Sequence, residues 1–134
     1  MSKSPAVRPE IISPASVHST AGVGYSHVAR VGNLVFIAGQ VALDRDNGLV
    51  GEGDIETQVR QAYANLGAIL AELGGSFRNV VKFTTYLTRR EDLAAFRKVR
   101  NEVLGEPFPP NTLLFVAGLA RPEYMVEIEA VAAL

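Results

Sequence analysis

Few side chains in this 134-residue chain could carry catalysis, and this narrows its chemistry. The chain contains no cysteine, so thiol catalysis, disulfide frameworks, cysteine-ligated zinc and iron–sulfur clusters are excluded. Its only imidazoles are those of His18 and His27, which do not have the spacing of a helical metal-binding motif. We therefore expect no metal site. His27 is a candidate proton carrier, although a histidine at the start of a strand is more often solvated; His18 is expected to have no function.

Positive charge is concentrated in one stretch of the sequence. Between residues 78 and 100, seven basic residues stand against Glu91 and Asp92, a local charge of +5. A solvated helix face is the common explanation for such a run, and an anion-binding surface is the alternative. The whole chain has a net charge of −1, so no global field attracts it to nucleic acid or to an anionic membrane.

The composition is that of one globular domain. Half of the residues are apolar (48%), yet no apolar run approaches the roughly 20 residues of a membrane span. The first residues also lack the apolar region of a signal peptide. We therefore expect a cytoplasmic protein without membrane association. Residues 1–22 have little periodicity and indicate a loose arm with one short strand near residues 10–12, and residues 23–134 form the domain.

The first half of the domain is predicted to be a hairpin followed by a helix. Residues 28–31 and 34–38 are rich in β-forming side chains and are separated by a Gly32-Asn33 turn, with Gly39 closing the second run. From residue 55 to residue 73, apolar side chains recur at helical spacing. Asp54 is the expected N-cap of this helix, and the pair of glycines at 74–75 is its expected end.

The second half repeats strand and helix and then ends in two strands. Residues 80–87 form a β-branched and aromatic run, and the spacing of Thr88 and Glu91 is that of a capping box before a helix over 90–104. Strands are expected over 112–116 and 125–131. This order predicts an α+β fold in which both helices cover one face of a mixed sheet of about six strands. The other face would be apolar and bare, so we expect it to pack against another copy.

Five segments follow one another in the order Gly24-Tyr25-Ser26-His27, residues 31–40, residues 54–58, Val80-Val81-Lys82 and residues 126–130. Together they resemble the RidA/YjgF family of reactive-intermediate deaminases, also described as endoribonuclease L-PSP. The similarity covers residues 22–133. It implies a chorismate-mutase-like (YjgF) fold, a homotrimer with ligand clefts between subunits, and catalysis without a cofactor or metal. It also implies hydrolysis of the enamines and imines that pyridoxal-phosphate enzymes release, which gives 2-oxoacids and ammonia.

The chain departs from the family at several cleft positions. The family's catalytic arginine, which binds the substrate carboxylate, is replaced by Asn111, which has no charge to offer a carboxylate. An ungapped count places Arg97 where the family has a cleft asparagine. Leu113 takes the place of a cysteine, and Ala38 takes that of the serine before Gly39. The resemblance therefore implies a more apolar ligand site, formed by these five residues, and leaves the usual 2-iminopropionate deaminase activity in doubt.

Two residues match the catalytic positions of the family. Glu127 corresponds to the carboxylate that positions the attacking water, and Tyr25 corresponds to the tyrosine that borders the cleft. Glu129 is two residues further along the same strand and points to the same face. Salt bridges across an interface and a buried tyrosine are the structural alternatives.

Arg97 is predicted to reach into the cleft and to face Asn111, replacing the lost charge. Its position at the edge of the apolar stripe of the helix over 90–104 allows this direction. Arg100 is the rival cation if the count is wrong, and Lys98 is expected to be solvated. The alternative is that Arg97 belongs to a solvated basic face.

Three functions stay open at this point. The first is a trimeric hydrolase, similar to the deaminases, whose cleft binds a small carboxylate or carbonyl compound. The second is a non-catalytic binding or regulatory module. The third is an RNA-binding protein or ribonuclease, which the net charge, the absence of a catalytic histidine pair and the few aromatic residues disfavour.

Overall fold

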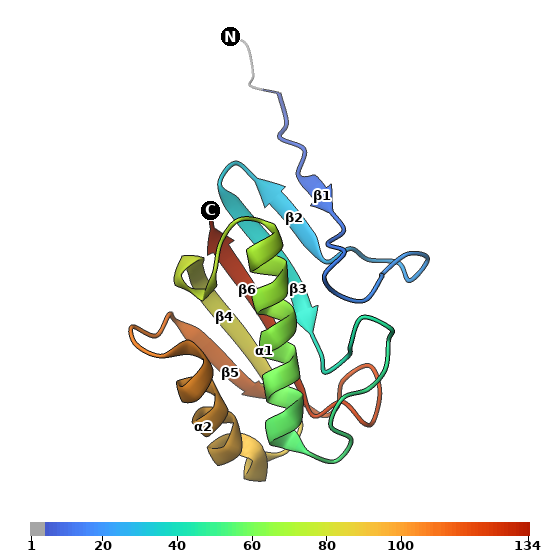
Figure 1. Ribbon diagram of the computed structural model, residues 1–134, viewed down its shortest axis with the longest axis vertical. Helices are drawn as coiled ribbons and strands as arrows, with labels where there is room; N and C mark the ends of the chain where they lie inside the picture. The colour runs from blue at the N-terminus through green and yellow to red at the C-terminus, as the bar shows by residue number, and fades with distance from the viewer. Residues whose placement is uncertain (1–4) are drawn as a thin grey trace.

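The computed structural model describes residues 5–134, in which two helices lie against one face of a sheet (Figure 1). The helices are α1 (Ile55–Glu72) and α2 (Leu93–Leu104), and 3-10 turns precede β4 and α2. The α+β prediction is therefore confirmed. The strands are β1 (Glu10–Ile12), β2 (Val28–Val31), β3 (Leu34–Gln40), β4 (Val80–Leu87), β5 (Asn111–Phe115) and β6 (Val126–Ala133).

The sheet has the strand order β1-β2-β3-β6-β4-β5. β4 and β5 are parallel, and α2 makes the crossover between them, as a parallel pair requires. All other neighbours are antiparallel. The last strand of the chain, β6, thus lies in the middle of the sheet. Its alternate side chains point to the face covered by the helices, here called the helix face, and to the opposite face, called the open face.

The hairpin between β2 and β3 forms as predicted. Gly32 has φ +61°, a left-handed conformation that favours glycine, and Val31 pairs with Leu34 across the two-residue turn. The prediction that Gly39 closes the second strand is wrong, because β3 continues to Gln40. The register between β3 and β6 shifts between Ile37 and Gln40, so Gly39 lies within a bulge of the strand.

Helix α1 begins and ends where the sequence indicates. The Asp54 carboxylate accepts hydrogen bonds from the Thr57 amide at 3.2 Å and from the Thr57 hydroxyl at 2.8 Å, so Asp54 is the N-cap. Beyond the last turn, Gly74 has φ +88°, as is common just after a helix. The buried side of α1 packs on the sheet with Val59, Leu66 and other apolar side chains.

The predicted capping box before α2 is wrong. No side chain caps the first turn, which is a 3-10 turn over Arg90–Asp92. Arg89 holds this turn instead, since its guanidinium donates to both carboxylate oxygens of the buried Asp92 at 3.0 and 2.8 Å. The helix ends at Gly105, which has φ +65°.

The N-terminal arm contains the expected short strand β1 but is not loose after it. The Glu72 carboxylate accepts hydrogen bonds from the amides of Ala15 and Ser16 at 3.2 and 3.0 Å. Val17 and His18 are buried, and Val17 joins the main core. The arm is therefore anchored to the end of α1.

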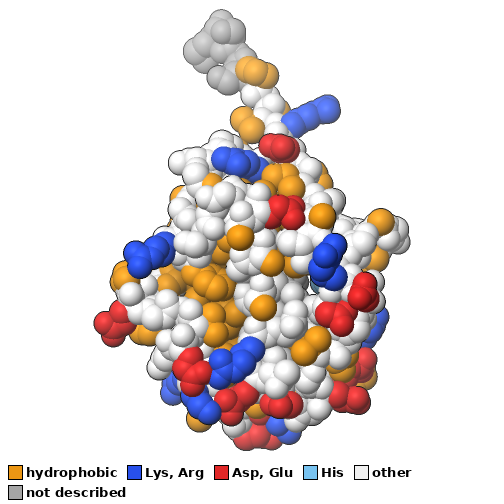
Figure 2. All heavy atoms as spheres, in the orientation of Figure 1, with side chains coloured by type: hydrophobic (Ala, Val, Ile, Leu, Met, Phe, Trp, Pro, Cys, Tyr) orange, Lys and Arg blue, Asp and Glu red, His pale blue; other side chains and the backbone are white. Residues whose placement is uncertain are grey.

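Figure 2 shows the helix side of the molecule, where acidic and basic side chains gather at the end at which both helices begin. Apolar side chains gather left of the centre in this view. Phe77, Phe108 and Pro107 help to line a hollow of about 390 Å³. None of the helices within residues 5–134 has the length and apolarity that crossing a membrane requires.

Candidate functional site

Two carboxylates of β6 lie on the open face of the sheet. Glu127 and Glu129 alternate with Val126, Ile128 and Ala130, which belong to the core on the helix face. Both glutamates are half-buried. Burial, and secondly the charge of Glu129, raise the pKa of Glu127 above its ordinary value. A carboxyl group with a raised pKa is suited to hold and release a proton.

Gly39 provides the space that Glu127 occupies. A Cβ atom at position 39 would lie 2.5 Å from the Oε2 atom of Glu127 and 2.7 Å from its Cδ atom. The carboxylate therefore lies directly over the bulge of β3, and only a glycine leaves it room. The neighbouring residue Ala38 donates its amide to the carbonyl of His27 at 2.8 Å. It also helps to line a hollow of about 520 Å³ that Glu129 borders.

Tyr25 lies within the electrostatic reach of the Glu127 carboxylate. Burial, and secondly the charge of Glu127, raise the pKa of the Tyr25 phenol, although 47% of the residue's surface is exposed. The phenol therefore keeps its proton and can donate it to a ligand beside Glu127. The structure thus brings together four of the predicted site residues, namely Tyr25, Ala38, Gly39 and Glu127.

The other three predicted site residues lie on the other side of the sheet. Asn111 accepts a hydrogen bond at its Oδ1 atom from the hydroxyl of the buried Thr85 at 2.9 Å. Leu113 alternates with Asn111 along β5 and packs against the main core. Arg97 is exposed on α2, and within residues 5–134 no hydrogen bond or ion pair joins it to another side chain. One protomer does not bring Arg97 or Asn111 to Glu127.

The two histidines lie under the arm, and the alternative that His27 is solvated is wrong. His27 is 2% exposed and His18 is 5% exposed. The amide of Gln40 donates to Nδ1 of His27 at 3.0 Å and to the carbonyl of Ala38 at 3.1 Å. His27 Nδ1 is therefore an acceptor, and its Nε2–H donates to the carbonyl of His18 at 2.8 Å. This network fixes one neutral tautomer of His27.

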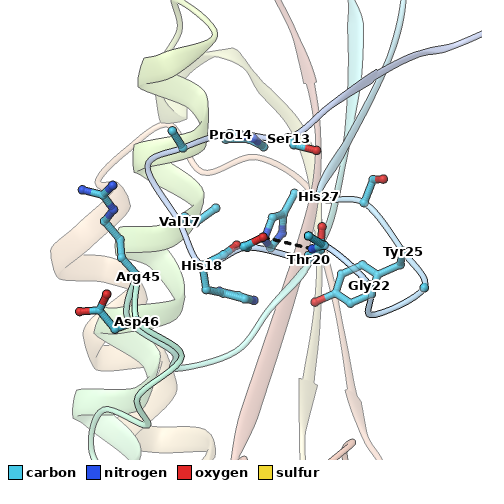
Figure 3. A pocket seen from close by; sticks show the side chains of 15 residues that line it. Ser13, Pro14, Val17, His18, Thr20, Gly22, Tyr25, His27, Arg45 and Asp46 are labelled. Carbon is cyan, nitrogen blue, oxygen red and sulfur yellow. Dashed lines mark hydrogen bonds between the residues drawn. The ribbon is translucent and has the colours of Figure 1, made fainter.

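A cavity of about 1130 Å³ lies beside this pair (Figure 3). The arm and the following turn line it between Ser13 and His27, and Arg45 and Asp46 lie on the side opposite Tyr25. The rings of His18 and His27 meet edge to face at 4.7 Å. Among the described residues, Nδ1 of His18 is buried without a hydrogen-bond partner.

The register of the β2–β3 hairpin is the sequence signal that could have predicted the hydrogen bonds between His27 and Gln40. A two-residue turn that pairs Val31 with Leu34 places His27 opposite Ala38 and hence beside Gln40. No comparable signal existed for His18, because the arm has no periodic pattern. No three His, Asp or Glu side chains of residues 5–134 are grouped so that they could hold a metal ion.

Comparison with known proteins identifies relatives over nearly the whole chain. The family described as Endoribonuclease L-PSP matches residues 16–134. A RutC family protein of Pyrococcus abyssi is 38% identical over 108 residues, which are 81% of this chain and 84% of that protein. The 2-iminobutanoate/2-iminopropanoate deaminase of Mus musculus is 34% identical over 119 residues, covering 88% of this chain and 87% of the deaminase.

A solved structure confirms the fold. The crystal structure of RidA from an Antarctic Psychrobacter has a TM-score of 0.85 and 32% sequence identity to this chain. The match covers 93% of this chain and 99% of that one. The expected YjgF-type fold is therefore confirmed.

Proposed function

We propose that this chain, which belongs to the endoribonuclease L-PSP (RidA/YjgF) family, hydrolyses imines or enamines of small carboxylic acids in a cleft between subunits of a homotrimer. One observation carries the proposal. The Glu127 carboxylate lies over Gly39 beside the Tyr25 phenol, where a small ligand meets a proton-holding acid and a hydrogen-bond donor.

Hydrolysis of an imine needs a positioned water and a source of protons. Water adds to the carbon of the C=N bond, and the nitrogen gains a proton as the C–O bond forms. The resulting amino alcohol releases ammonia and leaves the 2-oxo group. Glu127 binds the water and exchanges protons with the reacting nitrogen, and Tyr25 donates a hydrogen bond to the bound substrate. None of these steps uses a cofactor or metal.

The position of Asn111 supports a site made by two copies of the chain. Asn111 and Glu127 belong to opposite sides of the sheet in one protomer. A cleft that uses both must therefore take them from different subunits. Thr85 occupies the Oδ1 atom of Asn111, so its NH₂ group is left to donate to a substrate carboxylate. Arg97 is the cation proposed to act with it.

The open face supports assembly. Strands β2 to β5 each carry exposed apolar side chains, which would be costly to leave in water. An oligomer buries such a face. The exposed apolar residues on these strands are Val31, Leu34, Phe36, Val81 and Leu114.

Ammonia release from freshly generated 2-iminopropanoate and from imines of larger 2-oxoacids tests the proposal. We expect the wild-type protein to exceed Glu127→Gln on at least one imine. On 2-iminopropanoate it should fall roughly ten- to a hundred-fold below a relative that carries arginine at the position of Asn111, because a charge-assisted hydrogen bond is missing. Rates equal to those of Glu127→Gln on every substrate would overturn the proposal.

The replacement of the family's catalytic arginine by Asn111 favours one second candidate function, a binding module without hydrolase activity. Such a module would retain small carboxylates without turnover. Mass spectrometry of what the denatured protein releases would detect its ligand, and the Glu127→Gln variant would then bind this ligand with nearly unchanged affinity.

A further inference from the structure

Tyr86 makes the two carboxylates of the open face unequal. Its hydroxyl donates a hydrogen bond to Oε1 of Glu129 at 2.6 Å. In the strand register Tyr86 lies opposite Glu127, so the phenol reaches diagonally past its direct neighbour to Glu129. Within residues 5–134, no side chain donates a hydrogen bond to Glu127. One carboxylate of the pair therefore has a donor and the other has none.

We propose that Tyr86 is a positioning residue whose hydrogen bond to Glu129 places the exchangeable proton of the carboxylate pair on Glu127. The inference rests on the proposed function, in which Glu127 exchanges protons with the substrate. Tyr86 itself touches Glu129 and acts on the reaction only through that carboxylate.

The physical basis is the competition of two nearby carboxylates for one proton. Glu127 and Glu129 are two residues apart on one strand face, where ionising both brings like charges together. A hydrogen bond to an ionised oxygen is stronger than one to a neutral acid. The phenol therefore favours the arrangement in which Glu129 bears the charge. This charge in turn contributes to the raised pKa of Glu127.

Tyr86 is suited to stay a donor. Its hydrogen bond to Glu129 raises the pKa of its phenol, because losing the proton would place two negative oxygens together. The other groups that face the pair are Lys82 on β4, His27 just before β2, and the phenols of Tyr25 and Tyr124. None of these donates a hydrogen bond to either carboxylate in the described structure.

The test follows the carboxyl carbons of both glutamates by ¹³C NMR in protein labelled at glutamate, without substrate. Glu127→Gln and Glu129→Gln assign the two signals. In the wild type, we expect the upper titration step to appear on Glu127 alone. In Tyr86→Phe, the preference of the proton for Glu127 should fall about tenfold, so both carbons titrate in that step. Glu129→Gln should lower the midpoint of Glu127, because the neighbouring charge is gone.

Tyr124→Phe is the matched control, because it removes a nearby phenol that does not bond to Glu129, and it should leave both titrations unchanged. A Tyr86→Phe protein in which Glu127 alone still titrates in the upper step would overturn the inference. So would an unchanged Glu127 midpoint in Glu129→Gln.

Kinetics give the second readout. Where the chain hydrolyses an imine, Tyr86→Phe should lower kcat and leave KM unchanged, and Glu129→Gln should move the alkaline limb of the rate profile to lower pH. A Tyr86→Phe protein with a changed KM and an unchanged kcat would contradict the role of Tyr86. The NMR titration needs no turnover, so its failure can be told apart from a failure of the proposed hydrolysis.

Discussion

The two faces of the sheet are built from the same strands and differ in what completes them. On the helix face, α1 and α2 bury side chains such as Val35, Phe83 and Ile128 almost completely. On the open face, Phe36 of the same sheet is 46% exposed, and polar groups such as Glu127 stand among the apolar ones. The apolar side chains of the helix face are thus buried within one chain, whereas those of the open face stay exposed in one protomer.

This difference explains why the titratable groups of the candidate site lie on the open face. A finished core consists of packed apolar groups, and an uncompensated charge there would be very costly. The open face is partly wet in one protomer and becomes dry only if another copy covers it. Half-buried carboxylates on that face can keep both a proton and access to a ligand. Asn111, on the other side, can join them only across a subunit boundary.

The largest expected effect on stability comes from truncating a buried side chain on the helix face. Phe83→Ala removes a ring that is 1% exposed and packs against Tyr63 at 5.9 Å, so it should lower the free energy of unfolding by about 3–5 kcal/mol. Urea unfolding followed by circular dichroism measures this loss. Phe36→Ala is the matched control and should cost far less in the folding of one protomer. Equal losses for the two variants would erase the distinction between the faces.

A charged side chain introduced on the open face should prevent assembly and leave the fold of the protomer intact. We expect the wild-type protein to be a trimer and Phe36→Lys to be a folded monomer, because the lysine charge would be desolvated in the interface. Light scattering after size exclusion gives both masses. Val23→Lys, an exposed position outside the sheet, should stay trimeric. A wild-type protein that is monomeric at micromolar concentration would refute the assembly and, with it, the two-copy site.

Gly39→Ala tests the carboxylate site on the open face. The added methyl group would occupy the place of the Glu127 carboxylate and push it aside, so hydrolysis or ligand affinity should fall at least tenfold. Stability should change little, because Gly39 has no left-handed φ and the glutamate side chain can turn away. Gly118→Ala is the control, since nothing lies within 4 Å of the Cβ atom there. Full activity in Gly39→Ala would mean that Glu127 need not lie over β3.

Much of the helix face could be predicted from the sequence. The turn at Gly32, the N-cap Asp54 and the helical spacing of apolar residues are local signals, and the structure follows them. The open face could be predicted only in outline. Alternation along β6 puts Glu127 and Glu129 together, but it says nothing of which strands lie beside β6. The contact of Tyr86 with Glu129 needs that strand order.

The remaining errors have physical causes. Thr88 and Glu91 have the spacing of a capping box, but the ion pair between Arg89 and Asp92 holds that turn instead. His18 is buried by the fold of an arm that carries no periodic pattern, so no signal in the sequence indicated its burial.

The smallest expected effect is a difference in how pH acts on the two regions. Burial, and secondly the proximity of His27, lower the pKa of His18 below 6.5. The unfolded chain therefore binds a proton at His18 more readily than the folded one, and the stability from His18 is complete above pH 6.5 and lost as pH falls below it. The raised pKa of Glu127 acts in the opposite direction. Its contribution is complete below the ordinary value of 4.5 and is lost as pH rises through the higher folded value.

Two variants separate these contributions in melting curves taken from pH 4 to pH 8. His18→Leu should flatten the fall in Tm below pH 6.5, and Glu127→Gln should flatten the loss that begins above pH 4.5. Each change in Tm should be smaller than the one that Phe83→Ala causes. His18→Leu keeps the backbone carbonyl that His27 binds, so it removes a titrating group without breaking the tautomer network. The structure indicates that the polar groups under the arm and those on the open face titrate independently. If both variants changed Tm over the same pH range, that independence would be refuted.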